Sequence, residues 1–265
     1  MEVAMVTGAS SGIGRATALE LARQGYHVVA AGRSEERTRP VVDQIEGEGG
    51  SAEFLQVDLA SLQSCERAAK QFAASSRSLD VLVANAGVGG VGGLTKDGFE
   101  IHFGVNHLGH FALTQYLQPT FRSGTRVVVV SSEVHRRADG IDFDRVREKR
   151  GLFERLSAYG ESKLANILFA RHLARIAPDL NTYSLHPGMA DTNIFPAIAK
   201  PFFRGRKPPE EAARTVIYCA TSDEVAGQSG RYYSRMAERE PSPAAQDDAL
   251  AEELWTRSEE WCGPT

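Results

Sequence analysis

The chain has 265 residues, a formal net charge of -4 at pH 7, 42% hydrophobic residues and 24% charged residues. This balance is typical of a globular protein with a sizeable core, and the absence of a dense Lys/Arg stripe excludes a nucleic-acid surface. Three scattered cysteines provide neither a disulfide framework nor a zinc spacing, and no apolar run reaches the roughly 18 residues of a membrane span. We therefore expect a cytoplasmic protein without a metal site.

The first predicted element is an apolar strand over residues 2–7, followed by a glycine turn over residues 8–14 and a helix that begins near Ile13. Glycines let the backbone approach a pyrophosphate, and the free N–H groups at the helix start point at the anion. Such a turn is a weak signal alone, but its position between a strand and a helix strengthens it. The start of the chain therefore predicts a phosphate site.

The second predicted strand covers residues 26–32 and ends at Arg33. A carboxylate at this position would accept the ribose hydroxyls of NAD, whereas a guanidinium can hold a 2′-phosphate with two parallel hydrogen bonds. Arg33 therefore favours NADP(H), with NAD(H) as the alternative. The simpler reading is that Arg33 is a solvated turn residue.

Further strands are predicted over residues 53–58, 80–84, 126–131, 182–186 and 231–234, with helices between most of them. This alternation predicts an α/β fold, a Rossmann-type doubly wound parallel sheet whose ligand lies at the carboxyl ends of the strands. The absence of a convincing linker predicts a single domain over residues 1–265. The polar or turn-forming residues that follow the strands are Gly8, Arg33, Asp58, Asn85, Ser132 and Pro187.

A helix over about residues 157–177 carries Tyr159 and Lys163, four residues apart and so on one helical face. A phenol that ionises near neutral pH needs its pKa lowered by about 3 units, or roughly 4 kcal/mol. One ammonium at about 4 Å and an effective dielectric of about 20 supplies roughly that amount. The pair is a candidate general acid/base, although such spacing alone is also common on exposed helix surfaces.

Together these motifs resemble the classical short-chain dehydrogenase/reductase family. Residues 99–111, 162–166 and 186–188 resemble its retinol dehydrogenase and WW-domain oxidoreductase branch. The matching pieces are the turn over residues 7–14, Asp58-Leu59, Asn85-Ala86-Gly87, Asn106, Ser132, Tyr159 with Lys163, and Pro187-Gly188 followed by Thr192.

The resemblance implies roles for these residues. Tyr159 would exchange the proton of the substrate oxygen, Ser132 would hold that oxygen, and Lys163 would lower the Tyr159 pKa and bind the nicotinamide ribose. Asn106 would support a water-filled proton relay. The remaining implied cofactor contacts are Gly8, Ser10, Ser11, Gly12, Ile13 and Gly14 at the pyrophosphate, Arg33 and Ser34 at the 2′-phosphate, Asp58 and Leu59 at the adenine, Asn85, Ala86 and Gly87 at the ribose, and Pro187, Gly188 and Thr192 at the nicotinamide.

One segment departs from the simplest members of the family. An insertion over about residues 133–156 would cover a surface that commonly packs against another subunit, so we expect a monomer or homodimer rather than a tetramer.

Residues 189–207 contain Phe195, Phe202 and Phe203 and are expected to cover an apolar substrate, with plain packing as the alternative. Ser11 stands where NADP-preferring members often have a basic residue, which leaves phosphate recognition mainly to Arg33.

The sequence thus predicts an NADP(H)-dependent oxidoreductase that interconverts a carbonyl and an alcohol on a retinoid-, steroid- or polyketide-like molecule. The alternatives are a non-catalytic dinucleotide sensor or scaffold and, less favoured, a sugar-nucleotide enzyme of the extended branch. His107 and His110 lack a third metal ligand and are expected to pack in the interior or on the surface. Glu133 and His135 lie beside Ser132, but no serine-hydrolase elbow surrounds them.

Overall fold

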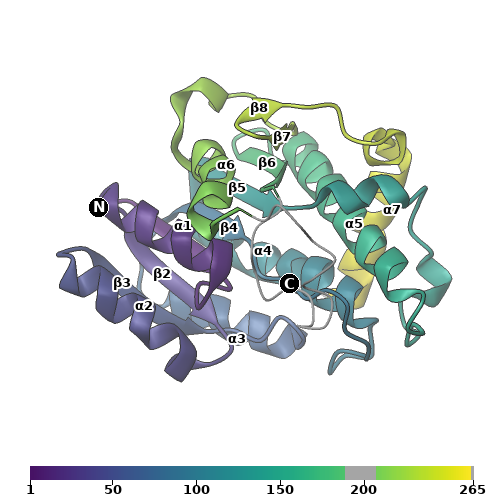
Figure 1. The fold of residues 1–265 in the computed structure, drawn as a ribbon, viewed down its shortest axis with the longest axis horizontal. Helices are drawn as coiled ribbons and strands as arrows, with labels where there is room; N and C mark the ends of the chain where they lie inside the picture. The colour runs from purple at the N-terminus through teal and green to yellow at the C-terminus, as the bar shows by residue number, and fades with distance from the viewer. Residues whose placement is uncertain (189–206, 264–265) are drawn as a thin grey trace.

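The computed structural model describes residues 1–188 and 207–263, and within them eight strands form one sheet in the order β3-β2-β1-β4-β5-β6-β7-β8 (Figure 1). Neighbouring strands are parallel except for the last pair, β7 and β8. The strands are β1 Val3–Thr7, β2 His27–Gly32, β3 Ser51–Gln56, β4 Leu79–Ala84, β5 Phe121–Val130, β6 Asn181–His186, β7 Tyr232–Ser234 and β8 Ala237–Glu238.

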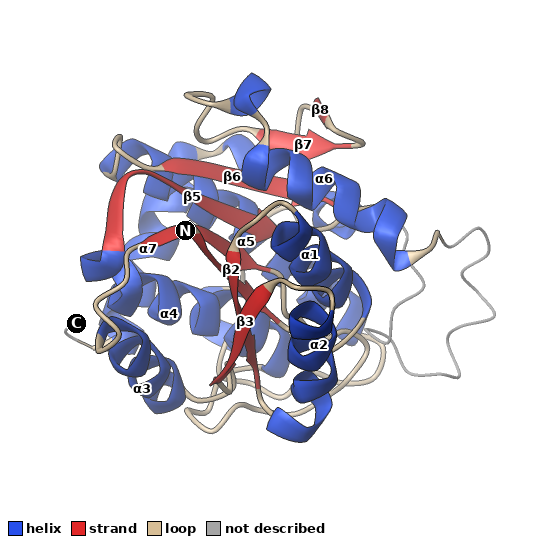
Figure 2. Ribbon diagram, turned by 90° about the vertical axis from the view of Figure 1, so that its left-hand side faces the viewer, coloured by secondary structure: helices blue, strands red, loops and turns tan. Residues whose placement is uncertain are grey.

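Helices cover both faces of this sheet (Figure 2). α1, α2 and α6 pack on one face, and α3, α4 and α5 pack on the other, where α7 lies against α5. The helices are α1 Gly12–Arg23, α2 Glu35–Gly47, α3 Leu62–Ala73, α4 Gly109–Leu117, α5 Arg155–Ile176, α6 Pro209–Thr221 and α7 Asp248–Cys262. The predicted Rossmann-type doubly wound sheet is therefore confirmed.

The central strands are buried on both faces, as a covered parallel sheet requires. In β5, Val127 and Val129 belong to the core under α3, α4 and α5, whereas Val128 and Val130 belong to the core under α1, α2 and α6. Successive side chains of a strand point to opposite faces, so an unbroken run of valines suits this position. The run therefore anchors the strand that leads directly into Ser132.

The chain changes direction across the sheet at β1, which lies between β2 and β4. From β1 the chain first winds outward to β2 and β3 and then returns to β4 on the other side. The connections after β1 and β4 consequently leave the sheet towards opposite faces and open a crevice at the carboxyl ends. This topology places the glycine turn after β1 next to the segment that follows β4.

Three local features differ from the sequence-based expectations. Residues Phe103–Leu108 form a π-helical turn ahead of α4, where a regular helix was expected. β8 was not expected, because two residues carry no periodic pattern. The insertion after β5 contains 3₁₀ turns at Glu133–Arg137 and Phe143–Arg145 before α5 begins at Arg155. The expected cover over residues 189–207 lies outside the described residues except for Lys207.

Candidate active site

A cleft of about 1120 Å³ opens at the carboxyl ends of β1, β2, β4, β5 and β6. Most of the residues expected at a site line it, although they come from segments far apart in the chain. Gly14 and Asn106 lie just behind its wall, and Thr192 lies outside the described residues. The expected residues that line the cleft are Gly8, Ser10, Ser11, Gly12, Ile13, Arg33, Ser34, Asp58, Leu59, Asn85, Ala86, Gly87, Ser132, Tyr159, Lys163, Pro187 and Gly188.

The glycine turn has the backbone geometry of a phosphate cradle. Gly8 and Gly12 adopt positive φ angles of 69° and 55°, which glycine accepts at little cost. A Cβ on Gly14 would lie 2.3 Å from the carbonyl oxygen of Gly8, so only glycine lets α1 begin this close to the turn. Ser11, the residue before α1, makes no side-chain capping bond, and the first N–H groups of the helix therefore remain available to an anion.

At the far end of the cleft, Arg33 and Arg37 both line the wall after β2. The Ser34 hydroxyl accepts a hydrogen bond from the backbone N–H of Arg37 at 3.3 Å and so caps α2. Sequence reasoning missed Arg37. Its signal was its place in the chain, because it lies in the first turn of α2, directly after the expected phosphate contacts Arg33 and Ser34.

Asp58 stands on the opposite wall of this end, after β3. Burial raises the pKa of its carboxyl, but Lys96, at 2.8 Å, and the backbone N–H of Ala60, at 3.1 Å, lower that pKa by more. Asp58 is therefore an ionised acceptor whose orientation is fixed by two partners.

Ser132, Tyr159 and Lys163 meet in the middle of the cleft. Ser132 follows β5, and the other two project from α5, one turn apart. The Ser132 side chain is close enough to the Tyr159 hydroxyl to act on its pKa, which it lowers. Nζ of Lys163 lies 5.7 Å from the centre of the Tyr159 ring and donates to the carbonyl oxygen of Val130 at 2.9 Å. The structure thus gathers a phenol, a hydroxyl and an amine at one wall.

The protonation of this group differs from the expectation that Lys163 lowers the Tyr159 pKa. Burial raises the pKa of Tyr159 to about 12, against a smaller opposite effect from its bond to Ser132. Burial also lowers the pKa of Lys163 to about 7, so near neutral pH the amine is only partly charged. In the protein alone, desolvation outweighs the attraction between ammonium and phenolate, and the Tyr159 hydroxyl keeps its proton.

Asn106 holds the segment after β4 rather than lining the cleft. Its Oδ1 accepts from the backbone N–H of Val88 at 2.8 Å, and its Nδ2 donates to the carbonyl oxygen of Val88 at 3.0 Å. Nδ2 also lies 2.9 Å from the hydroxyl of Ser162 on α5. A Cβ on Gly87 would come within 3.1 Å of Asn106 Oδ1, so a larger residue would crowd the Asn106 side chain where this segment crosses the π-helical turn.

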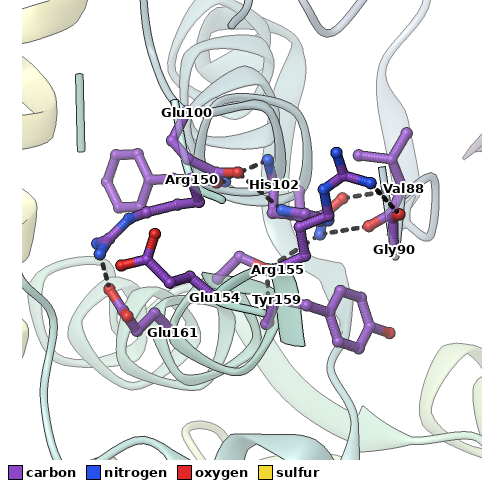
Figure 3. Close-up of polar contacts among 12 residues, drawn as sticks. Val88, Gly90, Glu100, His102, Arg150, Glu154, Arg155, Tyr159 and Glu161 are labelled. Atoms are coloured by element: carbon purple, nitrogen blue, oxygen red, sulfur yellow. Dashed lines mark hydrogen bonds and ion pairs between the residues drawn. The ribbon is translucent and has the colours of Figure 1, made fainter. Parts of the chain in front are cut away.

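A second contact fixes the same segment to α5. Arg155 donates to the carbonyl oxygen of Gly90 at 3.4 Å, one turn before Tyr159. Figure 3 shows the Tyr159 ring directed to the side of Val88 and Gly90 and away from Glu161. Asn106 and Arg155 thus join this segment to α5, the helix that carries Tyr159.

The histidines considered as alternative sites lie in the interior. His107 and His110 are both buried, and no group of three His, Cys, Asp or Glu side chains in the described part of the chain is placed to hold a metal ion. His135 Nδ1 faces the carbonyl oxygen of Ser132 at 2.6 Å, and its Nε2 accepts from the backbone N–H of Ser242 at 3.1 Å. Both nitrogens face backbone groups, so His135 is not a general base for the Ser132 hydroxyl.

Apolar side chains at the mouth of the cleft were also missed by sequence reasoning. Val91, after β4, and Leu156, at the start of α5, line the cleft and are 36% and 41% exposed. No periodic pattern marks either of them, because Val91 lies in an irregular segment and Leu156 in the first turn of its helix. Together they give the entrance an apolar rim, opposite His186 at the end of β6.

A doubly wound parallel sheet with a glycine-rich turn suited to a phosphate after its first strand defines the class of dinucleotide-binding α/β proteins. The family model described as short chain dehydrogenase matches residues 2–140. Dehydrogenase/reductase SDR family member 13 from Bos taurus is 41% identical over 98% of this chain and 73% of that protein. Retinol dehydrogenase 14 from Homo sapiens is 39% identical, over a match that covers 98% of this chain and 85% of that protein.

A solved short chain dehydrogenase from Burkholderia cenocepacia J2315, in complex with NADP, shares 26% identity with a TM-score of 0.72 and covers 93% of this chain and 98% of that one. The chain belongs to the short-chain dehydrogenase/reductase family, oxidoreductases whose fold binds nicotinamide dinucleotides. The resemblance to the retinol dehydrogenase branch is confirmed. Within residues 1–188 and 207–263, no helix combines the length and apolar character that crossing a bilayer requires.

Proposed function

We propose that the protein is an NADP(H)-dependent oxidoreductase that interconverts a carbonyl and an alcohol on a hydrophobic small molecule. The observation that carries this proposal is that Tyr159 and Ser132 come together at the wall of the dinucleotide cleft, with Lys163 one helical turn away. Two hydroxyls at one point can hold a carbonyl oxygen, and one of them can exchange a proton with it.

In this proposal Ser132 positions the substrate oxygen and Tyr159 supplies or removes its proton. The bound nicotinamide supplies or accepts the hydride, since this chemistry belongs to the cofactor. The raised pKa of Tyr159 keeps its proton in place for donation to a carbonyl. In the oxidative direction, a charged Lys163 favours the phenolate, which links removal of the alcohol proton to the charge state of the amine.

Asn106 acts in the proposal through the segment that it holds. Its side chain fixes Val88 on one side and contacts Ser162 on the helix of Tyr159 on the other. Any proton path beside Lys163 would therefore run along the segment at Val88, which Asn106 holds against α5. The proposed contribution of Asn106 is to fix the position of this segment.

The preference for NADP(H) rests on the end of the cleft after β2. Arg33 and Arg37 line it, and Arg33 stands where a carboxylate would be expected for NAD(H). Two guanidinium groups suit the doubly charged 2′-phosphate. A solved relative in complex with NADP also supports the preference.

The proposed hydrophobic substrate rests on the apolar rim formed by Val91 and Leu156. A retinoid-, steroid- or polyketide-like body would bury these side chains on entering the cleft. The name of the 39% identical relative, retinol dehydrogenase 14, is consistent with such a body.

We further propose that the whole chain is one domain that acts in the cytoplasm as a monomer or homodimer. The support for a small assembly is α7, which covers α5 within the chain. Trp255 stacks on His172 with ring centres 5.0 Å apart, and it lies 5.9 Å from the ring of Phe169. This part of α5 is already buried and is not available to a second subunit.

Replacing Tyr159 by Phe tests the proposed chemistry, because it removes only the hydroxyl. With a panel of aldehydes, ketones and alcohols, we expect kcat to fall by about a hundredfold or more while cofactor affinity changes little. Full turnover by the Phe variant contradicts the proposal. Tight cofactor binding by the unaltered protein without any turnover across the panel would favour the alternative, a dinucleotide sensor or scaffold.

A further inference from the structure

A second cavity of about 610 Å³ adjoins the cleft at its β6 end. The two share four wall residues, namely Glu133, His186, Pro187 and Gly188. Its other walls come from α6 and from the turn between β7 and β8. A molecule whose reacting carbon lies against Tyr159 can therefore extend past Gly188 into this space.

Positive charge predominates in the walls of this cavity, which carry five Lys or Arg side chains and three Glu side chains. Arg136 pairs with Glu133 at 2.8 Å, and Lys207 pairs with Glu211. In the described part of the chain, the guanidinium groups of Arg214, Arg235 and Arg239 have no carboxylate within ion-pair distance. Of the three Glu side chains in these walls, only Glu240 also lacks an ion pair, so its single negative charge faces three unpaired guanidinium groups.

Glu133 lies between the two cavities, but it does not block an anion. Its carboxylate is bonded to Arg136 and accepts from the hydroxyl of Tyr232 at 3.0 Å. Both contacts lower the pKa of Glu133 against the effect of burial, so the group is ionised and its charge is already matched by Arg136. The passage between the cavities is therefore close to neutral, and the positive charge lies beyond it.

The turn that carries Arg235 has an unfavourable backbone. Arg235 and Met236 adopt φ angles of 55° and 57°, which are normally left to Gly, Asn or Asp in a two-residue hairpin turn. The backbone N–H of Met236 donates to Thr215 Oγ1 at 3.3 Å, and this bond ties the turn to α6 beside Arg214. The fold thus accepts local strain and holds Arg235 and Arg214 at the wall of one cavity.

From these contacts we propose that the second cavity is a subsite for an anionic oxygen group, a carboxylate or phosphate, carried by the substrate away from its reacting carbon. Arg214 and Arg235 are its principal ligands, and Arg239 adds charge at the rim. Guanidinium groups match the planar oxygen pair of a carboxylate and the oxygens of a phosphate. The substrate class becomes an amphipathic carbonyl or alcohol, with an apolar body at Val91 and Leu156 and a charged end here. This inference rests on the proposed function.

The test compares two substrates that differ only in charge, a medium-chain ω-oxo fatty acid and its methyl ester. For the unaltered enzyme we expect kcat/KM to favour the acid by about tenfold, and a matching ω-oxo alkyl phosphate tests the second anion. Arg214→Gln and Arg235→Gln should each bring the acid-to-ester ratio towards one through a fall in kcat/KM for the acid. Arg235→Lys keeps the positive charge but loses the paired N–H donors of the guanidinium, so it should give an intermediate ratio.

Arg231→Gln is the matched control, because Arg231 lies on the same edge of the sheet but pairs with Glu238 and does not line the cavity. It removes the same charge and should leave the ratio unchanged. Equal use of acid and ester by the unaltered enzyme overturns the subsite while the proposed function stands. An equal fall of the acid-to-ester ratio in the Arg231 variant also overturns the subsite. Such a fall would show that the preference for the acid comes from the overall positive charge and not from direct contacts.

A binding measurement separates the subsite from the chemistry. The saturated fatty acid of the same chain length lacks the ω-aldehyde and cannot be reduced. Its affinity for the cofactor-loaded protein can therefore be measured by calorimetry. We expect about tenfold weaker binding by the Arg214→Gln and Arg235→Gln variants than by the Arg231→Gln control. Unaltered affinity in those two variants rejects the subsite, whether or not the enzyme turns over any carbonyl.

Discussion

Nε2 of His110 lies 2.9 Å from the hydroxyl oxygen of Thr7, and this contact links α4 to the end of β1. On its other side, Nδ1 of His110 faces the carbonyl oxygen of Asn106 at 3.0 Å. Burial lowers the pKa of His110 to about 4, so the ring is neutral and carries one proton. A carbonyl oxygen can only accept, which puts that proton on Nδ1 and makes Thr7 the donor to Nε2.

The Thr7 hydroxyl then has a full set of partners. It donates to His110 and accepts from the backbone N–H groups of Asn85 and Ala86 at 2.9 and 3.0 Å. One buried oxygen thereby joins the strand before the glycine turn, the segment after β4 and the helix that follows Asn106. The phosphate end and the Tyr159 end of the cleft share this junction.

We expect Thr7→Val to weaken this junction, because valine keeps the shape of threonine but removes the oxygen. Two backbone N–H groups and one ring nitrogen would lose their partner, which costs about 1–3 kcal/mol for each group left unsatisfied. Denaturant unfolding should show this loss, and fluorescence titration should show weaker cofactor binding. Thr7→Ser keeps the hydroxyl and serves as the control. Equal stability and affinity of the Val and Ser variants would contradict the assigned network.

The pH dependence of stability should report on Lys163. Its pKa is about 7 in the folded protein, below the ordinary 10.5, because burial disfavours the charged form. Between these pH values the unfolded chain holds a proton that the folded chain lacks, so this group makes unfolding free energy rise with pH. The slope from one such group is about 1.4 kcal/mol per pH unit.

Lys163→Met removes this contribution while keeping an unbranched apolar side chain. Urea unfolding of both proteins between about pH 7.5 and about pH 8.5 should therefore give a steeper rise for the unaltered protein than for the variant. The difference between the two proteins isolates Lys163 from the cysteines, whose raised pKa values act in the opposite direction at higher pH. Parallel curves would mean that Lys163 is charged in the folded state.

Cofactor preference should depend on Arg33. Arg33→Asp replaces a candidate phosphate ligand by a carboxylate, which repels a 2′-phosphate and can accept ribose hydroxyls. We expect the ratio of kcat/KM for NADPH over NADH to fall by about tenfold to a hundredfold. Arg39→Asp is the control, because Arg39 lies nearby on α2 but pairs with Glu35 and does not line the cleft. An unchanged ratio in the Arg33 variant would remove the assignment of the phosphate site.

The sequence predicted those parts of the fold and candidate site that depend on local spacing. The strand–turn–helix around Gly8 and the helical face shared by Tyr159 and Lys163 follow from residue order and period, and the structure has both. The pKa of Tyr159 was not predictable in this way, since it depends on how much of the chain buries the phenol. The expected lowering by Lys163 considered one charge and omitted the desolvation of both groups.

Long-range packing explains the remaining differences. The π-helical turn at Phe103–Leu108 places Asn106 against Val88, and no short pattern encodes a contact between segments 18 residues apart. β8 forms only because β7 offers it an edge. Arg37 belongs to the cleft because α2 starts beside the glycine turn, which is a property of the assembled sheet.

Gly109 provides a test of the packing that positions the wall of the cleft at Leu59. A Cβ on this residue would lie 2.4 Å from the carbonyl oxygen of Leu59, a backbone atom that cannot turn aside. Gly109→Ala should therefore separate α4 from the segment after β3, at a cost of about 1–3 kcal/mol in unfolding free energy. Leu59 lines the cleft, so cofactor affinity should fall as well.

Gly47→Ala is the matched control for this substitution. Gly47 ends α2, and a Cβ there would meet no heavy atom within 4 Å, so alanine should be neutral or stabilise the fold by up to about 1 kcal/mol. Thermal or denaturant unfolding of the two variants, together with a cofactor titration, distinguishes a steric effect at Leu59 from a general effect of alanine. If Gly109→Ala were as stable as Gly47→Ala and bound the cofactor equally well, α4 would not determine the position of the cleft wall at Leu59.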